Sequence, residues 1–338
     1  MFTERRINTR QLQREKLPWP EGKPFKILSL DGGGICGIYG ATILSYIEEE
    51  LTDSKPIGQY FDMVAGTSTG GIMALGVAAE IEARKICGLY EVEGKHIFES
   101  AWYWFGPVKL FLQTIRNLYA EAPLEKELKK QFGELLLGDA KTRVMIPAFL
   151  IPDSEVAVFK TDHHPDYKKD WQTPMWKVAR ATSAAPTYFP GLHCGDKKFL
   201  DGGIWANNPT MLAVVEALSS YDIVPEQIHV LSIGAGNKPF NISAYKANGG
   251  FWNWKEVIKA SMFLSTDNAT AQASLLLGPQ NLLRLEPSGE GLGIELDDWK
   301  TAMSILVPMA KAHCMEGLSD IRKFFEQAAS PRGKFYSA

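Results

Sequence analysis

Cysteine is scarce in this sequence, and the few that occur are scattered. Cys36, Cys87, Cys194 and Cys314 show neither C-x-x-C spacing nor nearby pairs of histidines. Disulfide-stabilised domains need a dense cysteine framework, and structural zinc sites need closely spaced ligands. We therefore expect no disulfide framework and no metal site, and the pattern indicates a reducing compartment.

Long apolar runs, polybasic blocks and a large net charge are also missing. The segment Met1–Lys16 is charged and lacks the apolar core of a signal peptide. The longest charge-free run, Met63–Ala79, is rich in Gly, Ser and Thr and is too short and too polar to span a bilayer. The net charge of −3 provides no electrostatic footprint for nucleic acid. These absences predict a cytoplasmic protein without a nucleic-acid partner.

The composition is that of an ordinary globular protein. The 338 residues are 45% hydrophobic and 22% charged, and they suffice for one large α/β domain or two smaller ones. Residues 1–24 are charged and contain Pro18, Pro20 and Pro24, which predicts an N-terminal arm. Because no internal repeat or linker interrupts the rest, residues 25–338 are predicted to form a single domain.

A serine flanked by glycines follows the apolar segment Phe61–Ala65. The residues Gly66-Thr67-Ser68-Thr69-Gly70 match G-x-S-x-G, and the small and apolar residues of Ile72–Ile81 predict a buried helix after them. A strand, a sharp turn and a helix with serine at the apex form the context of a nucleophile elbow. The two glycines let the backbone turn and leave the hydroxyl exposed at a helix N-terminus. The pentapeptide alone also arises by chance, so the assignment needs a second motif.

A second glycine-rich turn comes earlier in the chain. Lys26–Leu30 predicts a buried strand, and the segment DGGGICG at 31–37 leads into helical spacing over Ile38–Leu51. Dinucleotide-binding folds also carry G-x-G-x-x-G here, but they end their second strand with Asp or Glu, where this chain has Gly66-Thr67-Ser68. Successive glycine N–H groups at a helix N-terminus form an anion cradle, and beside an exposed serine such a cradle is an oxyanion hole.

A serine nucleophile needs a base that the fold holds in place. In α/β-hydrolases the chain order is Ser, acid, His, and only His229 and His313 come late enough. They lie in a predicted strand and at the end of a predicted helix, where structural histidines are common. Asp201 stands at a strand end before Gly202 and Gly203, and a desolvated aspartate can itself act as general base. The residues alone leave both a Ser–Asp dyad and a Ser-Asp-His triad open.

The remaining chain alternates predicted strands and helices and then becomes mostly helical. Further strands are predicted at Arg143–Leu150, Val156–Phe159, Lys197–Leu200, His229–Ile233 and about Asn281–Leu285. Helices are predicted over Ala122–Phe132, Pro174–Ala184, Asn207–Leu218, Trp254–Leu277, Asp298–Lys311 and Cys314–Ala329. The aromatic segment Trp102–Phe111 predicts a packed insert over the sheet, with an acyl-chain wall or a membrane-contacting cap as the alternative. This segment and Phe251–Trp254 are candidates for a lid.

Three separated motifs together match one family. D-G-G-G-x-x-G at 31–37, G-T-S-T-G at 66–70 and D-G-G at 201–203 resemble the motifs of the patatin-like phospholipases in order and spacing. Ala179–Pro190 and Asn207-Asn208-Pro209 resemble the family too. The resemblance extends from about Lys26 to Gly236. It implies an α/β fold with three α/β/α layers and a mostly parallel central sheet, in which residues 25–338 form the patatin-like phospholipase domain with a helical C-terminal part.

The resemblance implies a serine–aspartate dyad that works without metal or cofactor. By position, Ser68 is the nucleophile and Asp201 is the base. The backbone N–H groups of Gly32, Gly33 and Gly34 are expected to hold the tetrahedral oxyanion. The other motif glycines are expected to support these turns: Gly37, Gly66, Gly70, Gly202 and Gly203.

One position departs from the family pattern. Arg or Lys usually precedes the last glycine of the first motif, and Cys36 stands there in this chain. A cation could strengthen the field on the oxyanion or brace the loop, and a neutral thiol cannot. The backbone donors remain, so activity is still expected, weaker or differently controlled. Burial as a small apolar residue is the favoured interpretation of Cys36, ahead of a redox role.

The function implied by the resemblance is that of a phospholipase A-type serine hydrolase that releases fatty acids from membrane phospholipids. Compact bacterial members include antiphage effectors that a cyclic oligonucleotide switches on. A cyclic dinucleotide activator, peripheral contact with the inner membrane and a homo-oligomer are therefore further expectations. Two alternatives stay open: an α/β-hydrolase esterase with a Ser-Asp-His triad, and a non-catalytic protein that binds a phosphate or nucleotide on the glycine loop. The motifs do not specify acyl chain, head group or position of cleavage.

Overall fold

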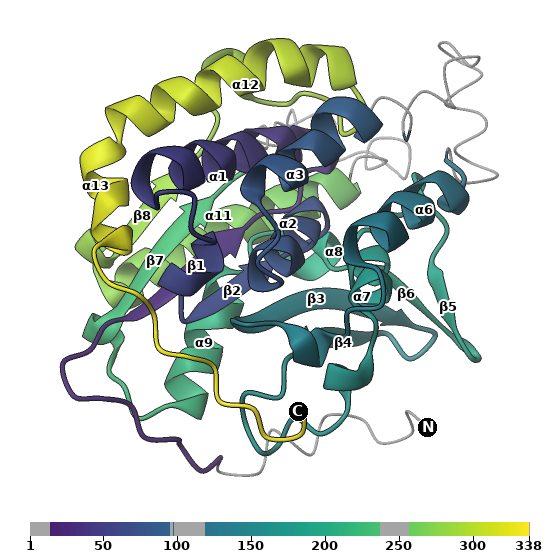
Figure 1. Ribbon diagram of the computed structural model, residues 1–338. Coiled ribbons are helices and arrows are strands. Elements are labelled where there is room, and N and C mark those ends of the chain that lie inside the picture. The colour runs from purple at the N-terminus through teal and green to yellow at the C-terminus, as the bar shows by residue number, and fades with distance from the viewer. Residues whose placement is uncertain (1–13, 95–96, 98–118, 237–256, 338) are drawn as a thin grey trace, which may run out of the picture.

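An eight-stranded sheet forms the centre of the computed structural model, which describes residues 14–94, 97, 119–236 and 257–337 (Figure 1). The strands are β1 (Phe25–Leu30), β2 (Met63–Gly66), β3 (Arg143–Ile151), β4 (Glu155–Lys160), β5 (Leu192–Cys194), β6 (Lys197–Asp201), β7 (Ile228–Ile233) and β8 (Leu282–Leu285). Their order is β5-β6-β3-β2-β1-β7-β8, with β4 paired to β3. Neighbours from β3 to β8 along this path run parallel, whereas the pairings that involve β4, β5 and β6 are antiparallel.

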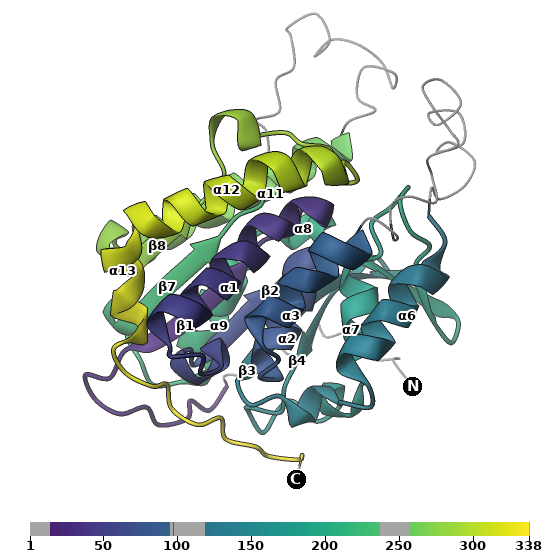
Figure 2. The same ribbon diagram turned by 45° about the horizontal axis from the view of Figure 1, so that its top comes forward.

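Helices cover both faces of this sheet (Figures 1 and 2). Their bounds are α1 (Ile38–Leu51), α2 (Thr69–Ala78), α3 (Ala83–Gly88), α6 (Glu121–Phe132), α7 (Met175–Thr182), α8 (Gly203–Ala206), α9 (Thr210–Ser220), α11 (Val257–Leu277), α12 (Trp299–Glu316) and α13 (Leu318–Arg322). The helices α1, α2, α7 and α12 form one hydrophobic core with the sheet. The helix α9 and the end of α11 form a second hydrophobic core with it. The predicted three-layer α/β/α fold is confirmed.

The side chains of β1 show why this strand lies at the centre. Phe25 and Ile27 pack on the α9 face, while Leu28 and Leu30 belong to the core on the α1 face. All six residues of the strand are buried, as expected for a parallel strand with helices on both faces. This double burial explains why Ile27, Leu28 and Leu30 are apolar although they point to opposite faces of the sheet.

The C-terminal part is helical, but its helices are divided at a different place from the prediction. The sequence predicts a break between Lys311 and Cys314, whereas α12 continues through both residues. The helix ends before Gly317, the residue type that least favours a helix apart from proline, and only the short α13 follows. Residues 326–337 run on without a helix, so the prediction of a helix as far as Ala329 is wrong. The sequence also does not predict β5.

The described part of the N-terminal arm is attached to the α9 side of the sheet. Leu17 forms a β-bridge with Tyr221, directly after α9, and Trp19 packs against Phe25 and the Tyr221 ring. Residues 14–24 contain no helix, and the domain boundary at residue 24 stays a prediction. The aromatic segments 102–111 and 251–254 lie outside the described residues. Of the helices that are described, none has the length and apolar character needed to cross a membrane.

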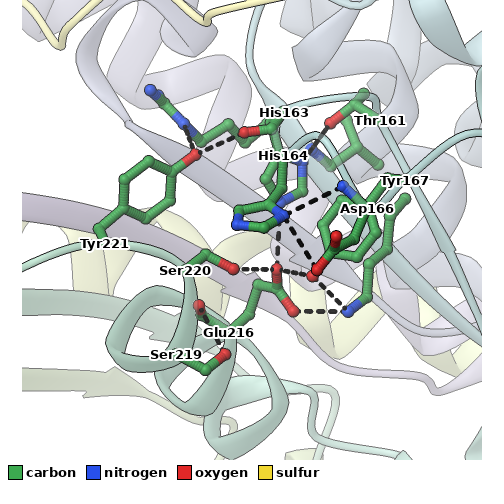
Figure 3. A network of polar contacts seen from close by, with 12 residues as sticks. Thr161, His163, His164, Asp166, Tyr167, Glu216, Ser219, Ser220 and Tyr221 are labelled. Atoms are coloured by element: carbon green, nitrogen blue, oxygen red, sulfur yellow. Dashed lines mark hydrogen bonds and ion pairs between the residues drawn. The ribbon is translucent and has the colours of Figure 1, made fainter. Parts of the chain in front are cut away.

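A buried polar network joins this arm to α9 and to the segment after β4 (Figure 3). At its centre, the Glu216 carboxylate accepts hydrogen bonds from Lys160, Tyr167 and Ser220. Arg14 of the arm donates to the hydroxyls of Tyr167 and Ser220. These donors and the nearby cations offset the cost of burying the negative charge of Glu216. The contacts of Arg14 also hold the arm against the domain.

Candidate active site

The two glycine-rich turns meet at the carboxyl ends of β1 and β2. These strands are parallel neighbours in which Leu30 pairs with Gly66, so the turns that follow them lie side by side. The other neighbour of β2 is β3. The strand β3 also pairs with β6, and in that pairing Ala148 lies opposite Asp201. Three separate segments therefore reach the edge of the sheet where ligands of open α/β folds bind.

Ser68 occupies the apex of a strained turn before α2. Its φ of 53° and ψ of −123° lie in a region that residues with a Cβ rarely adopt. A Cβ at Gly66 would lie 2.1 Å from the Gly70 carbonyl oxygen, and one at Gly70 would lie 2.2 Å from the Leu30 carbonyl oxygen. Both positions of the motif therefore require glycine. The geometry is that of a nucleophile elbow.

The Ser68 hydroxyl faces a carboxylate directly. Ser68 Oγ donates a hydrogen bond of 2.6 Å to Asp201 Oδ2. The other carboxylate oxygen, Oδ1, accepts the N–H of Gly203 at 2.7 Å, which fixes the orientation of the side chain. Ser68 is 7% exposed and Asp201 is 3% exposed, so the pair is shielded from bulk water.

The environment of Asp201 changes its acidity. Burial raises the pKa of the carboxyl to about 6, although the hydrogen bonds from Ser68 and the Gly203 N–H act in the opposite direction. A carboxylate with a raised pKa is a stronger base, and it remains ionised at neutral pH. The pair can therefore take a proton from serine without a histidine.

The glycine loop after β1 offers fewer free donors than predicted. The Gly32 N–H donates to the carbonyl oxygen of Asn207 at 3.0 Å. Within the described ranges, the N–H groups of Gly33 and Gly34 have no acceptor. The prediction that Gly32 contributes a third donor is therefore revised, because its N–H is already used within the fold. Gly33 and Gly34 remain the candidate donors for an oxyanion.

The supporting glycines stand where other backbone or side-chain atoms come close. A Cβ at Gly37 would lie 2.3 Å from Thr69 Oγ1, and a Cβ at Gly202 would lie 2.3 Å from the Pro147 carbonyl oxygen. Gly203 supplies the N–H that holds Asp201. The close contacts at Gly37 and Gly202 give these two glycines a packing reason.

Thr182 is a site residue that the sequence does not single out by itself. Its Oγ1 accepts the backbone N–H of Ser68 at 3.0 Å and donates to the Pro147 carbonyl oxygen at 2.6 Å. One hydroxyl thus joins the end of α7, the elbow and β3. The residue lies in the segment Ala179–Pro190, whose family resemblance was the only signal that could have indicated it.

Arg284 is a second residue near the site that no local sequence pattern indicates. From β8 it pairs with both carboxylate oxygens of Asp31, at 3.0 and 2.6 Å, and it also donates to Ser232. Glu286 pairs with the same guanidinium and accepts the Gly236 N–H at 3.0 Å. Asp31 is therefore anchored at the point where the glycine loop begins.

Cys36 is buried within the glycine loop. It is 3% exposed, its thiol lies 3.6 Å from the Ile294 carbonyl oxygen, and burial raises its pKa to about 12. A protonated, inaccessible thiol has little nucleophilic or redox reactivity. The structure agrees with the interpretation of Cys36 as a small buried residue.

No described histidine makes a hydrogen bond with Ser68 or Asp201. His313 Nδ1 is instead 2.7 Å from the Tyr39 hydroxyl. His229 pairs with Lys26 near the start of β7, about 13 Å along the strands from the edge that carries the elbow. Neither candidate of the triad alternative makes a described contact with the Ser68–Asp201 pair.

The described residues also contain no cluster of three or more His, Cys, Asp or Glu side chains that could hold a metal ion. What the arrangement provides is a serine hydroxyl, a buried carboxylate and backbone N–H groups at one place. These are the parts needed for acyl transfer through a covalent serine ester.

Comparison with known proteins places the chain in a family. The model of the family described as patatin-like phospholipase matches residues 28–214. The "cGAMP-activated phospholipase" of Escherichia coli (strain TW11681) is 36% identical over 230 residues, which cover 64% of this chain and 64% of that protein. The protein of the same name from Pseudomonas aeruginosa (strain BWHPSA011 / Pa011) is 33% identical over 261 residues, 74% of this chain and 75% of that one.

A plant protein is also similar. "Patatin-like protein 4" of Arabidopsis thaliana is 31% identical over 266 residues, which cover 69% of this chain and 65% of the plant protein. The chain thus spans slightly less than two thirds of the length of the Escherichia coli and Arabidopsis relatives. The family model covers more than half of the chain, and the relatives share about a third of its residues across most of it. This chain belongs to the patatin-like phospholipase family.

Proposed function

We propose that the protein is a phospholipase A-type serine hydrolase that releases fatty acids from membrane phospholipids, with Ser68 as nucleophile and Asp201 as base. The observation that carries the proposal is the 2.6 Å hydrogen bond from Ser68 Oγ to the buried Asp201 carboxylate at the apex of the elbow. The family assignment supports the reaction class. The absence of a histidine from this contact supports a dyad.

Acylation begins when Asp201 accepts the Ser68 proton as Oγ attacks a fatty-acyl carbonyl carbon. Negative charge then develops on the carbonyl oxygen, and the free N–H groups of Gly33 and Gly34 are the candidate donors that stabilise it. Collapse of the tetrahedral intermediate transfers the proton from Asp201 to the departing alcohol. The fatty acid is left as an ester on Ser68.

We further propose that a cyclic dinucleotide stimulates this activity. Support comes from the relatives, since those of Escherichia coli and Pseudomonas aeruginosa are named cGAMP-activated phospholipases. An activated enzyme would have to reach its lipid substrate, so peripheral contact with the inner membrane is part of the proposal. Self-association and a cytoplasmic location stay predictions.

Fatty-acid release from mixed phospholipid vesicles tests the proposal. Wild type and the Ser68→Ala variant are compared with and without a panel of cyclic dinucleotides, including cGAMP. We expect release by wild type that increases with one nucleotide, and no release by Ser68→Ala. The Ser304→Ala variant, which removes an exposed hydroxyl on α12, is the matched control and should behave as wild type.

Other outcomes would identify the alternatives. Loss of activity in His229→Ala or His313→Ala, together with full activity in Asp201→Asn, would establish a triad. Binding of a nucleotide without hydrolysis of any ester under all conditions would favour the non-catalytic phosphate-binding protein. Appreciable turnover by Ser68→Ala would overturn the assignment of the nucleophile.

A further inference from the structure

The two candidate oxyanion donors lie between residues whose own N–H groups are already bonded. On one side, the Gly32 N–H is used within the fold, and on the other, the Ile35 N–H donates to the Leu296 carbonyl oxygen at 2.9 Å. Between them, the N–H groups of Gly33 and Gly34 have no acceptor in the part of the chain that the structure describes. Because an oxyanion is stabilised most by donors that are in place before the reaction, the contacts that fix these two glycines affect catalysis.

Each of these two glycines packs closely against a different part of the chain. A Cβ at Gly33 would lie 2.3 Å from the Cβ of Ala235, which follows β7. A Cβ at Gly34 would lie 2.5 Å from the carbonyl oxygen of Leu296, in the connection between β8 and α12. The positions of the two donors therefore depend on the chain after β7 and on this connection.

Arg284 of β8 joins the start of the glycine loop to the chain after β7. Its guanidinium donates to both carboxylate oxygens of Asp31, at 3.0 and 2.6 Å, and pairs with Glu286. Glu286 in turn accepts the N–H of Gly236 at 3.0 Å. A Cβ at Gly234 would lie 1.9 Å from Glu286 Oε2 and 2.6 Å from Arg284 Nη2, so this ion pair packs directly against the chain after β7.

We propose that Arg284 positions the two oxyanion donors. Through Asp31 it holds the start of the glycine loop, and through Glu286 it holds the chain after β7, against which Gly33 packs. The proposal rests on the proposed function and adds a positioning residue to its oxyanion step. No described hydrogen bond joins Arg284 to either residue of the dyad, so its effect on the reaction passes through the loop.

The contacts of this side chain require the shape of arginine and not only its charge. A guanidinium carries five N–H donors in a planar fork, so it can bind both oxygens of Asp31 while it also donates to Ser232 and Glu286. Lysine carries its charge on one nitrogen and cannot hold two carboxylates in this fixed geometry. The side chain of Asp31 is 0% exposed and that of Arg284 is 15% exposed, so water competes little for these contacts. Loss of the fork should therefore loosen the loop even where the charge is kept.

Inhibition by an alkyl trifluoromethyl ketone measures the oxyanion donors directly. The carbonyl carbon of the ketone bonds to Ser68 Oγ, the serine proton passes to Asp201, and the carbonyl oxygen becomes an anion like that of the tetrahedral intermediate. The corresponding trifluoromethyl carbinol has the same chain but cannot form this adduct. In Arg284→Met, the Ki of the ketone should rise about tenfold or more, and kcat/KM for a p-nitrophenyl ester should fall by a similar factor. The Ki of the carbinol should stay within about twofold of wild type, because its binding needs no oxyanion donor.

Arg143 provides a matched control. It is a buried arginine at the start of β3, paired with the first residue of β2 and so at the end of the strands opposite the elbow. It donates to the Tyr221 hydroxyl and the Asp62 carbonyl oxygen, so Arg143→Met should lower thermal stability and leave both Ki values unchanged. A fluorophosphonate that reacts to completion counts the intact serine sites in each variant. If Arg284→Met does not fold, Arg284→Lys replaces it and should raise the Ki of the ketone about threefold or more.

The possible results separate this proposal from the proposed function. A ketone Ki that stays at the wild-type value in the intact sites of the Arg284 variant would overturn the positioning role. Equal rises for ketone and carbinol would also overturn it, because Arg284 would then act on binding of the chain and not on the oxyanion. The same rise of the ketone Ki in Arg143→Met would overturn it too. If wild type itself hydrolyses no ester through Ser68 and binds the ketone no more tightly than the carbinol, the proposed function fails, independently of Arg284.

Discussion

At the scale of single residues, the burial of Asp201 determines how it can act. The same loss of solvent raises its pKa to about 6 and makes its ionised form a stronger base. Only two described hydrogen-bond donors, Ser68 Oγ and the Gly203 N–H, reach the carboxylate. A more fully solvated or ion-paired aspartate would be ionised at lower pH but would be a weaker base. The site combines ionisation at neutral pH with useful basicity.

The pH dependence of activity should therefore have its acidic limb near pH 6. Asp201 must be ionised to accept the Ser68 proton, so kcat/KM should fall about tenfold per pH unit as the pH decreases through and below this value. Initial rates with a soluble p-nitrophenyl ester between pH 4 and pH 8 measure the limb. Asp201→Asn should lower kcat about 10²–10⁴-fold at pH 8.

A second carboxyl requires a control in this experiment. Burial also raises the pKa of Asp31 to about 6, although Arg284 beside it acts in the opposite direction. Asp31→Asn should lower the rate by disturbing the glycine loop but leave the limb near pH 6. A limb that moves with Asp31→Asn, or that lies near pH 4, would contradict the role of Asp201.

At the scale of secondary-structure elements, the end of α7 connects the elbow to β3. Thr182 Oγ1 accepts the Ser68 N–H and donates to the Pro147 carbonyl oxygen, so it satisfies two backbone groups with one hydroxyl. The elbow strains Ser68, and a strained residue persists only where its surroundings hold it. Thr182 therefore supports the elbow through the backbone N–H of Ser68 and not through the Ser68 hydroxyl.

Replacement of Thr182 by Val should lower both activity and stability. Valine keeps the shape but leaves the Ser68 N–H without an acceptor, which costs about 1–3 kcal/mol in the free energy of unfolding and about tenfold in kcat. Thermal unfolding and steady-state kinetics measure the two effects. Thr182→Ser should recover most of both, since the hydroxyl returns.

The next residue, Ser183, is the matched control for Thr182. Its hydroxyl donates to the Ala179 carbonyl oxygen within the same helix and does not reach the elbow. Ser183→Ala should therefore leave kcat within about twofold of wild type. Equal losses in Ser183→Ala and Thr182→Val would show that α7, rather than the Thr182 hydroxyl, supports the elbow.

The limits of sequence reasoning are visible at this scale. The G-T-S-T-G turn and the family resemblance predict the fold class and the meeting of two glycine-rich turns, because these depend on contiguous residues and on the parallel order of strands. The pairing of Asn207 with Gly32 and of Arg284 with Asp31 joins positions far apart in the chain. No local pattern encodes such contacts, so the use of the Gly32 N–H could not be predicted. The predicted break between Lys311 and Cys314 is wrong for a related reason, since α12 packs along α1 and continues to Glu316.

At the scale of the whole molecule, one segment after β4 fastens both ends of the described chain. His164 Nε2 lies 2.9 Å from the carbonyl oxygen of Glu15 in the N-terminal arm. Asp162 pairs with Arg332 and accepts the N–H groups of Tyr336 at 2.7 Å and Ser337 at 2.6 Å. The chain continues from this segment into α7, which carries Thr182. The same segment therefore contacts the N-terminal arm and the C-terminal residues and leads to the helix that supports the elbow.

The C-terminal residues are held by a buried ion pair between Arg332 and Asp162. The side chains of Arg332 and Asp162 are 1% and 0% exposed, and the guanidinium also donates to the carbonyl oxygens of Gly138 and Ala140. Burial raises the pKa of Asp162, but the N–H groups of Ser337 and Tyr336 and the charge of Arg332 outweigh it and lower the pKa to about 2. Since this folded-state pKa lies below the unfolded value of about 4, the stabilisation is present at neutral pH and is lost as the pH falls from about 4 to 2.

Asp162→Asn should release the C-terminal residues and destabilise the whole domain. The variant leaves the buried Arg332 charge without a counterion, which costs about 3–5 kcal/mol in the free energy of unfolding. Thermal unfolding at pH 7 should show this loss, and limited digestion with trypsin should cut faster after Arg332 and Lys334. The control is Asp320→Asn, which breaks an exposed pair with Lys323 and should change neither measurement. If Asp162→Asn unfolds at the wild-type temperature and resists trypsin equally, the C-terminal residues are held by their packing and not by this ion pair.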